Sequence, residues 1–268
     1  MFSYHNHSSW SDGQASIREM AEAARAAGVE EFGISDHLVL GPREFYLDAR
    51  LWSMGVNELS GYMADAQAVK AELDSPGFRV RIGLEVDYFP ESVDRVNSLL
   101  SGMPLDYVIG AVHFAGNFPI DSSAVYWENL SESERDSVWR SYVRLVGECA
   151  RRLDCSWLAH LDLPKKFGFQ APEDCVESME ALLDECASLG MLVEINTAGA
   201  DKACGEFYPS KRLLMRAVAS GVGLLVNADA HEPLQVARHF GEARRMLREL
   251  GVTKVAGFES RHCSWHSL

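Results

Sequence analysis

The chain has 268 residues, enough for one large domain or two small ones and close to the roughly 250 that a parallel α/β barrel needs. With 47% hydrophobic and 24% charged residues it has the composition of a soluble globular protein, and no run approaches the roughly 20 apolar residues of a membrane span. A formal net charge of −14 argues against a nucleic-acid-binding surface, because that requires clustered Lys and Arg; an anionic substrate is compatible with it if local cations, such as metal ions, offset the overall field.

Targeting and linker signals are missing from the sequence. The first residues lack the basic and apolar regions of a secretory signal peptide, and we therefore expect a cytoplasmic protein. No low-complexity tract, repeat or linker-like segment divides the chain, so residues 1–268 are predicted to form a single domain. The sequence gives no indication of the oligomeric state.

Short apolar runs alternate with longer amphipathic segments from one end of the chain to the other. Strands are predicted at residues 2–5, 32–35, 80–86, 107–112, 157–159, 191–195 and 222–226, with an eighth candidate at 252–258. Helices are predicted at residues 15–27, 58–73, 92–100, 132–153, 173–189, 211–219 and 236–250, several followed by the glycine that commonly ends a helix. This alternation implies parallel strands with helical crossovers, and seven or eight such units favour a barrel over an open sheet.

Residues that commonly bind metal ions fall at the ends of these predicted strands. In chain order they are His5, His7, Asp12, His37, Glu85, His113, His160, Asp229 and His231, where Asp12 lies in the turn after the first strand. In a parallel barrel the C-terminal ends of all strands open on one face, which is where active sites are built. We therefore expect these nine side chains to converge in space.

Each of these residues also has a structural interpretation when it is taken alone. His5 and His7 alternate along a strand and can face one ion, yet most such pairs are incidental. Asp12 could be a helix-capping or turn residue, and a histidine such as His113 could be a hydrogen-bonded core residue. Glu85 is the strongest candidate, because a carboxylate inside an apolar strand is costly unless it is paired or metal-bound.

The size of the set favours a multinuclear centre. One tetrahedral catalytic site uses three protein ligands, so nine are enough for two or three ions. Imidazole together with carboxylate suits Zn, Mn or Fe better than Ca or Mg. Asp87 shares the side-chain direction of Glu85 but could be a solvated rim residue, and His239, His262 and His266 are interpreted as solvent-exposed or structural.

These motifs resemble the PHP (polymerase and histidinol phosphatase) superfamily over nearly the whole chain. The resemblance rests on residues 5–8 (HNHS), 11–13 (SDG), 36–37 (DH) and 229–231 (DAH), with Glu85, His113 and His160. It implies a distorted (β/α)7 TIM-like barrel with a trinuclear metal centre. One ion would take His5, His7, Glu85 and Asp229, a second Glu85, His113 and His160, and a third Asp12, His37 and His231.

The segments between these motifs look most similar to the histidinol-phosphate phosphatase branch. They are residues 83–88 (GLEVDY), 112–114 (VHF), 160–167 (HLDLPKKF), 194–199 (EINTAG) and 208–210 (YPS). The resemblance implies hydrolysis of L-histidinol phosphate to L-histidinol and phosphate by a metal-bridging hydroxide. Glu85, Asp229 and His231 would act in catalysis, and Lys165, Lys166 and Lys202 would bind phosphate where relatives often carry arginine.

Two other interpretations remain open from the sequence. A PHP phosphoesterase could act on a nucleotide or an oligonucleotide end, and the acidic charge disfavours long nucleic acids but not mononucleotides. A metal-binding module that has lost catalysis is the other, and the complete ligand set argues against it. Residues 38–51, which follow the second strand at the barrel mouth, match no segment of the family, so substrate selection is undecided.

Overall fold

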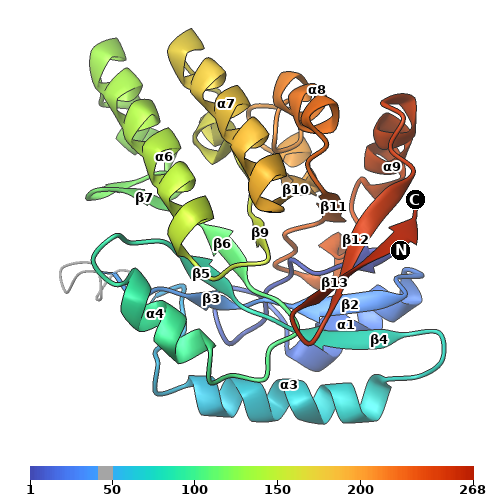
Figure 1. Cartoon of the computed structure of the whole chain (residues 1–268). Coiled ribbons are helices and arrows are strands. Elements are labelled where there is room, and N and C mark those ends of the chain that lie inside the picture. The colour runs from blue at the N-terminus through green and yellow to red at the C-terminus, as the bar shows by residue number, and fades with distance from the viewer. Residues whose placement is uncertain (42–50) are drawn as a thin grey trace.

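Parallel strands form the centre of the protein in a computed structural model that describes residues 1–41 and 51–268 (Figure 1). One ladder has the order β1-β2-β4, and a second has the order β11-β10-β9-β6-β5-β3. The strands are β1 (Phe2–Ser3), β2 (Glu31–Ile34), β3 (His37–Leu38), β4 (Arg79–Ile82), β5 (Glu85–Asp87), β6 (Ile109–Ala111), β9 (Trp157–Leu158), β10 (Leu192–Asn196) and β11 (Leu224–Asn227).

The two ladders are halves of one distorted barrel. Strands β2 and β3 belong to a single passage of the chain, and so do β4 and β5, so each of these passages takes part in both ladders. The barrel closes between its first and seventh passages, where Asn6 forms a parallel bridge with Ala230 and the amide of His7 donates to the Ala230 carbonyl at 2.8 Å. The predicted seven-stranded α/β barrel is therefore confirmed.

Helices surround this barrel, with α6 to α9 along one side of the strands and α3 and α4 along the other (Figure 1). Their bounds are α1 (Ile17–Ala26), α3 (Leu59–Leu73), α4 (Val93–Leu100), α5 (Ala124–Glu128), α6 (Glu132–Arg152), α7 (Glu173–Leu189), α8 (Lys211–Ser220) and α9 (Phe240–Glu249). Ser16 and Ser131 begin α1 and α6 with capping boxes, and Gly190 and Gly221 end α7 and α8 in the left-handed conformation. No described helix is both long and apolar enough to cross a membrane.

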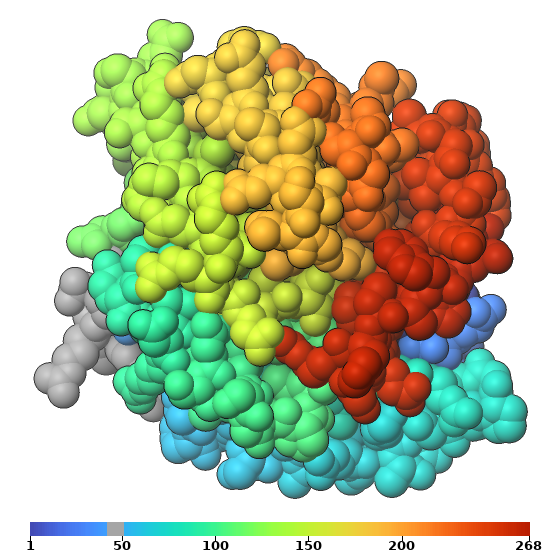
Figure 2. Space-filling model, viewed as in Figure 1, coloured from blue at the N-terminus to red at the C-terminus, as the bar shows by residue number. Residues whose placement is uncertain are grey.

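The structure corrects the sequence-based prediction at the C-terminal end of the chain. Residues 236–239 are not helical, because His239 adopts a left-handed φ of 56° and α9 begins only at Phe240. The eighth strand candidate is β12 (Lys254–Glu259), which pairs antiparallel with β13 (His262–Ser267) and does not join the barrel ladders. In Figure 2 this C-terminal segment, in red, lies on the surface of the molecule.

Elements that were not predicted lie in the loops after the strands. A short hairpin of β7 (Phe114–Ala115) and β8 (Phe118–Pro119) follows β6. Three 3-10 helices follow β9, β10 and β11, namely η2 (Leu163–Phe167), η3 (Thr197–Asp201) and η4 (Pro233–Gln235). These loops, together with Leu51 and Trp52, line the C-terminal end of the barrel. Most of the unmatched residues 38–51 lie outside the described part of the chain, because residues 42–50 are not described.

Aromatic side chains fill the barrel interior below its C-terminal end. Tyr107 is fully buried and donates its hydroxyl to the carbonyls of Tyr4 at 2.5 Å and Ile34 at 3.0 Å. Its ring stacks on Trp157 at 4.9 Å between centroids, and Phe258 from β12 packs on Trp157 at 5.0 Å. This apolar floor keeps water away from the polar side chains that lie directly above it.

The floor requires small residues on the neighbouring strands. A Cβ atom at Gly33 would lie 2.2 Å from the Tyr107 hydroxyl, which cannot move away without losing both hydrogen bonds. We expect Gly33→Ala to lower the free energy of unfolding by about 2 kcal/mol, as overpacked cores do. Urea unfolding monitored by circular dichroism measures the change.

Gly241→Ala is the matched control. Gly241 lies in α9, and a Cβ atom there would meet nothing within 4 Å, so this variant should be neutral or more stable by about 0.5 kcal/mol. Equal effects of the two substitutions would contradict the assignment of Gly33 as a close-packing position.

Candidate metal centre

The nine predicted side chains come together at the C-terminal end of the barrel. Each lies on one of the parallel strands or in the segment that follows it: His5, His7 and Asp12 after β1, His37 on β3, Glu85 on β5, His113 after β6, His160 after β9, and Asp229 and His231 after β11. They form four overlapping groups whose ligand-type atoms lie within 4.8 Å of one another. The convergence expected from the strand ends is therefore present.

Glu85 lies at the middle of this cluster and is 1% exposed. Its Oε2 lies 3.0 Å from His5 Nε2 and 3.0 Å from His37 Nδ1, and its Oε1 lies 3.1 Å from His160 Nε2. Ligands bound to zinc at about 2.0 to 2.1 Å in a tetrahedron lie about 3.4 Å apart. The spacing around Glu85 is close to that separation.

Two aspartates complete the cluster at its more open side. Asp229 Oδ1 lies 3.3 Å from His7 Nε2 and 3.6 Å from His5 Nε2. Asp12 lies 3.6 Å from His37 Nε2 through Oδ1 and 3.2 Å from His231 Nε2 through Oδ2. The side chains of Asp12 and His231 are each 32% exposed, so this edge of the cluster faces the cavity.

Several buried polar atoms of the cluster have no hydrogen-bond partner within the described residues. They are His5 Nε2, both ring nitrogens of His7, His37 Nδ1, Glu85 Oε2 and His160 Nδ1. Buried polar atoms in native proteins are almost always paired, so a set of orphaned nitrogen and oxygen atoms that face one another needs an explanation. Divalent ions bound by these atoms would provide one, and the residues present fit such ions.

The four groups do not reproduce the three ligand sets implied by the family resemblance. His113 and His160 each group with Glu85, but the third member is His37 in one case and His5 in the other. His7 groups both with Asp229 and with the set of Asp12, His37 and His231. The division of the nine residues among ions therefore stays a prediction.

A second layer of carboxylates orients the histidines. Glu194, on β10 and fully buried, lies 3.0 Å from His5 Nδ1 and accepts the backbone amide of His160 at 3.0 Å. Asp87 lies 3.1 Å from His113 Nδ1 and accepts the His113 amide at 2.9 Å. Such partners fix which ring nitrogen faces a metal ion.

Sequence reasoning did not assign these two carboxylates to the site. The interpretation of Asp87 as a solvated rim residue is wrong, because it is 2% exposed. The signal that identified Glu85, a carboxylate inside an apolar strand, applies equally to Glu194 and Asp87. Their roles toward neighbouring histidines could not be derived without knowing which strands pair.

The carboxylates give the cluster a strongly cation-attracting field. Burial disfavours a charged His113, yet Asp87 and Glu85 raise its pKa to about 10. Burial likewise opposes protonation of His37, and Glu85 and Asp12 raise its pKa to about 9. Burial lowers the pKa of His7 to about 3, with His37 and His231 acting in the same direction, so this ring is neutral and its unprotonated nitrogen can bind a cation.

A cavity of 830 Å³ opens onto this cluster. Its lining includes seven of the nine residues, namely Asp12, His37, Glu85, His113, His160, Asp229 and His231. The described end of the unmatched segment contributes Leu51, and Trp52 beside it packs edge-on against His37 at 5.0 Å between centroids. This volume lies within the roughly 300 to 1,000 Å³ that is typical of small-molecule sites.

The three predicted phosphate-binding lysines lie in different environments. Lys166 and Lys202 line the cavity, and Lys166 Nζ donates to the Asp121 carboxylate at 3.0 Å. Burial and the nearby Lys166 lower the pKa of Lys202. Lys165 does not line the cavity: it is 2% exposed, and its ammonium donates to the Phe207 carbonyl at 2.7 Å.

Asp162 and Glu206 also lie 3.0 and 3.1 Å from the Lys165 ammonium. The charge of Lys165 is thus paired inside the protein, and this lysine does not face a phosphate in the cavity. A cation that the sequence did not suggest is Arg238, which follows β11 and lines the cavity. Arg238 lies in the loop between β11 and α9, and the fold places it in the lining of the same cavity as Lys202.

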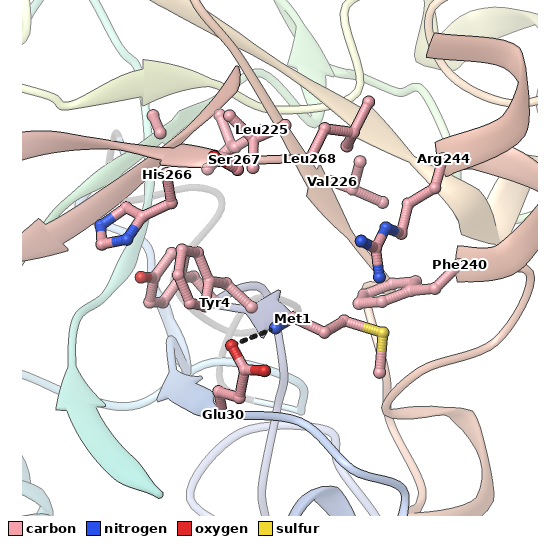
Figure 3. Close-up of a pocket in the computed structure, with 13 residues that line it drawn as sticks. Met1, Tyr4, Glu30, Leu225, Val226, Phe240, Arg244, His266, Ser267 and Leu268 are labelled. Atoms are coloured by element: carbon pink, nitrogen blue, oxygen red, sulfur yellow. Dashed lines mark hydrogen bonds and ion pairs between the residues drawn. The ribbon is translucent and has the colours of Figure 1, made fainter. Parts of the chain in front are cut away.

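A smaller cavity of 270 Å³ lies elsewhere, beside the N-terminal residues and the β12–β13 hairpin (Figure 3). Figure 3 shows Arg244 and Phe240 on one side of it and the ion pair between Met1 and Glu30, 2.7 Å long, on another. Of the nine candidate residues, none lines this cavity. His266 does so and packs on Phe2, in keeping with its interpretation as a structural or surface residue.

Comparison with known proteins identifies the same family as the motifs. A family model described as the PHP domain matches residues 3–198. The chain is 36% identical to a probable histidinol-phosphatase of Deinococcus radiodurans over 89% of this chain and 88% of that protein. It is 28% identical to a probable histidinol-phosphatase of Schizosaccharomyces pombe, over 92% of this chain and 85% of the relative.

The fold has a solved counterpart. The crystal structure of a histidinol phosphate phosphatase from Lactococcus lactis, complexed with zinc, L-histidinol and phosphate, superposes with a TM-score of 0.82 at 22% identity and covers 98% of both chains. This likeness concerns the arrangement of the backbone. Together with the family match over residues 3–198 and the 36% identity, it shows that this chain belongs to the PHP domain family.

Proposed function

We propose that this protein is a metal-dependent phosphomonoesterase that hydrolyses L-histidinol phosphate to L-histidinol and phosphate. The observation that carries the proposal is the convergence of nine histidine and carboxylate side chains in one cluster, seven of which line a cavity that also has two lysines in its wall. The similarity to histidinol-phosphatases over most of the chain supports the choice of substrate. The cavity volume suits a small phosphoester better than a nucleic-acid strand.

Glu85 is proposed as the ligand shared between ions, because three histidines approach its two oxygens within 3.1 Å. The other proposed ligands are His5, His7, Asp12, His37, His113, His160, Asp229 and His231. Two or three Zn, Mn or Fe ions in such a site would lower the pKa of water and neutralise phosphoryl oxygens. Glu194 and Asp87 hold the rings of His5 and His113 in the direction that this requires.

The cations of the wall are proposed to hold the substrate phosphate. Lys166 is fixed by Asp121, and Lys202 faces the same cavity and forms no ion pair with any of the described residues. Lysine acts as a point charge and not as a bidentate fork, so these residues attract phosphate without fixing its orientation as two arginines would. Asp229 and His231, at the open edge of the cluster, are the proposed groups beside the leaving oxygen.

Replacing the central carboxylate tests the proposed metal centre. Glu85→Gln keeps the shape of the side chain but removes the negative charge that three histidines surround, so both metal content and turnover should fall by about 100-fold or more. Metal analysis of the purified protein and phosphate release measure the two effects. Glu180→Gln, a carboxylate paired with Arg212 on the outer surface, is the control and should change neither. Full turnover and full metal content in Glu85→Gln would show that the bridging assignment is wrong.

Chelation tests whether metal ions stabilise the fold. Removing bound ions leaves orphaned buried atoms and unbalanced carboxylates, so the melting temperature should fall on treatment with a chelator. Restoring free zinc to about 100 times its dissociation constant should recover about 2.7 kcal/mol per site. Thermal unfolding with and without zinc provides the measurement, and identical curves would contradict a bound metal centre.

A substrate panel separates the proposed activity from its rival. Phosphate release from L-histidinol phosphate, AMP and a short single-stranded DNA with a terminal phosphate is compared on enzyme whose metals have been quantified. We expect histidinol phosphate to be turned over with a kcat/KM at least about tenfold higher than the others, a difference of about 1.4 kcal/mol in transition-state binding. A preference for AMP or for the DNA end would instead assign a nucleotide or oligonucleotide phosphoesterase.

A further inference from the structure

The turn that carries Asp229 has an unfavourable backbone conformation. Asp229 follows β11 with a φ of 50°, in the left-handed region that non-glycine residues seldom adopt. This conformation directs its carboxylate inward, where Oδ1 lies 3.3 Å from His7 Nε2 and 3.6 Å from His5 Nε2. Such a conformation persists only where the surroundings hold it.

Arg238 provides that support from the loop before α9. Its Nε donates to the Ala228 carbonyl at 2.9 Å and its Nη2 donates to the Asp229 carbonyl at 2.7 Å, so one guanidinium bridges two successive carbonyls of the turn. The side chain is 12% exposed, and its own backbone carbonyl accepts the Thr197 hydroxyl at 2.8 Å. Arg238 is thus held in place while it holds the turn.

The same carbonyl connects Arg238 to His231. His231 Nδ1 lies 3.1 Å from the Asp229 carbonyl, and a proton on Nδ1 leaves Nε2 unprotonated, facing Asp12 Oδ2 at 3.2 Å. A hydrogen bond from one ring nitrogen to a carbonyl is the usual way in which a metal-binding histidine is oriented. The position of the Asp229 carbonyl therefore affects two candidate ligands at once.

We propose that Arg238 is a positioning residue of the metal centre, which clamps the carbonyls of Ala228 and Asp229 and thereby sets the directions of the Asp229 and His231 side chains. The proposal rests on the proposed function only in treating these two residues as metal ligands. It does not depend on the identity of the substrate.

Charge alone predicts the opposite effect for this arginine. A guanidinium beside a cation site repels metal ions, so removing it should strengthen metal binding if its field were its main contribution. Removing the clamp should weaken metal binding, because the turn is then free to leave the left-handed conformation. The sign of the change in zinc affinity therefore distinguishes the two roles.

The matched control is Lys202, which lines the same cavity and carries the same charge but forms no hydrogen bond or ion pair with Ala228 or Asp229. Full-length wild-type protein, Arg238→Met, Arg238→Lys and Lys202→Met are stripped of metal, and zinc binding is measured by competition with a chromophoric chelator. We expect zinc affinity to fall about 10- to 100-fold in Arg238→Met, as for other residues that orient metal ligands. Lys202→Met should bind zinc as tightly as the wild type or more tightly.

Arg238→Lys keeps the charge but cannot reach both carbonyls as a fork does, so its affinity should lie between those of the wild type and Arg238→Met. Circular dichroism and thermal unfolding of the metal-free proteins establish that each variant is folded. If Arg238→Met does not fold, Arg238→Lys carries the test. Wild-type or tighter zinc affinity in the folded Arg238 variant would overturn the clamp. A wild-type protein that binds zinc but fails on every phosphoester would contradict the proposed function and leave this comparison intact.

Discussion

The buried charge of Glu85 is the constraint on which the site depends. A carboxylate that is 1% exposed inside a barrel is costly unless positive charge surrounds it. Three histidine nitrogens within 3.1 Å meet this need in part, and they leave orphaned ring and carboxylate atoms that face one another. Cations between these atoms would give each of them a partner. Cations held there would lie at the bottom of a cavity that is open to substrate.

The remainder of the fold keeps this constraint in place. The floor of Tyr107, Trp157 and Phe258 excludes water from beneath the cluster, and it requires glycine where the strands pass the Tyr107 ring. Above it, the Glu194 carboxylate forms hydrogen bonds with the His5 ring, the His160 backbone amide and the Asn196 side chain. One carboxylate therefore links neighbouring strands and orients a histidine. Stability and ligand geometry are therefore coupled through a small number of buried hydrogen bonds.

The wall of the cavity contributes positive charge in two forms. Lys166 and Lys202 face the cavity and suit an anionic substrate, whereas Arg238 uses its donors on backbone carbonyls of the β11 turn. Lys165 uses its charge inside the protein, beside Asp162 and Glu206, where it joins the loops after β9 and β10. Residues of similar charge and close sequence position thus differ in their contribution, according to which acceptors the fold places beside them.

The sequence by itself determined the barrel class, the strand ends and all nine clustered side chains, because these follow from local periodicity and from the shared direction of parallel strands. It could not determine which residues meet across the barrel. Asp87 and Glu194 act on histidines of neighbouring strands. Lys165 is buried away from the cavity, and Arg238 reaches the cavity from the loop before α9. The eighth strand candidate became half of an antiparallel hairpin outside the barrel ladders for the same reason: pairing depends on the partners available in space, and a single segment does not encode them.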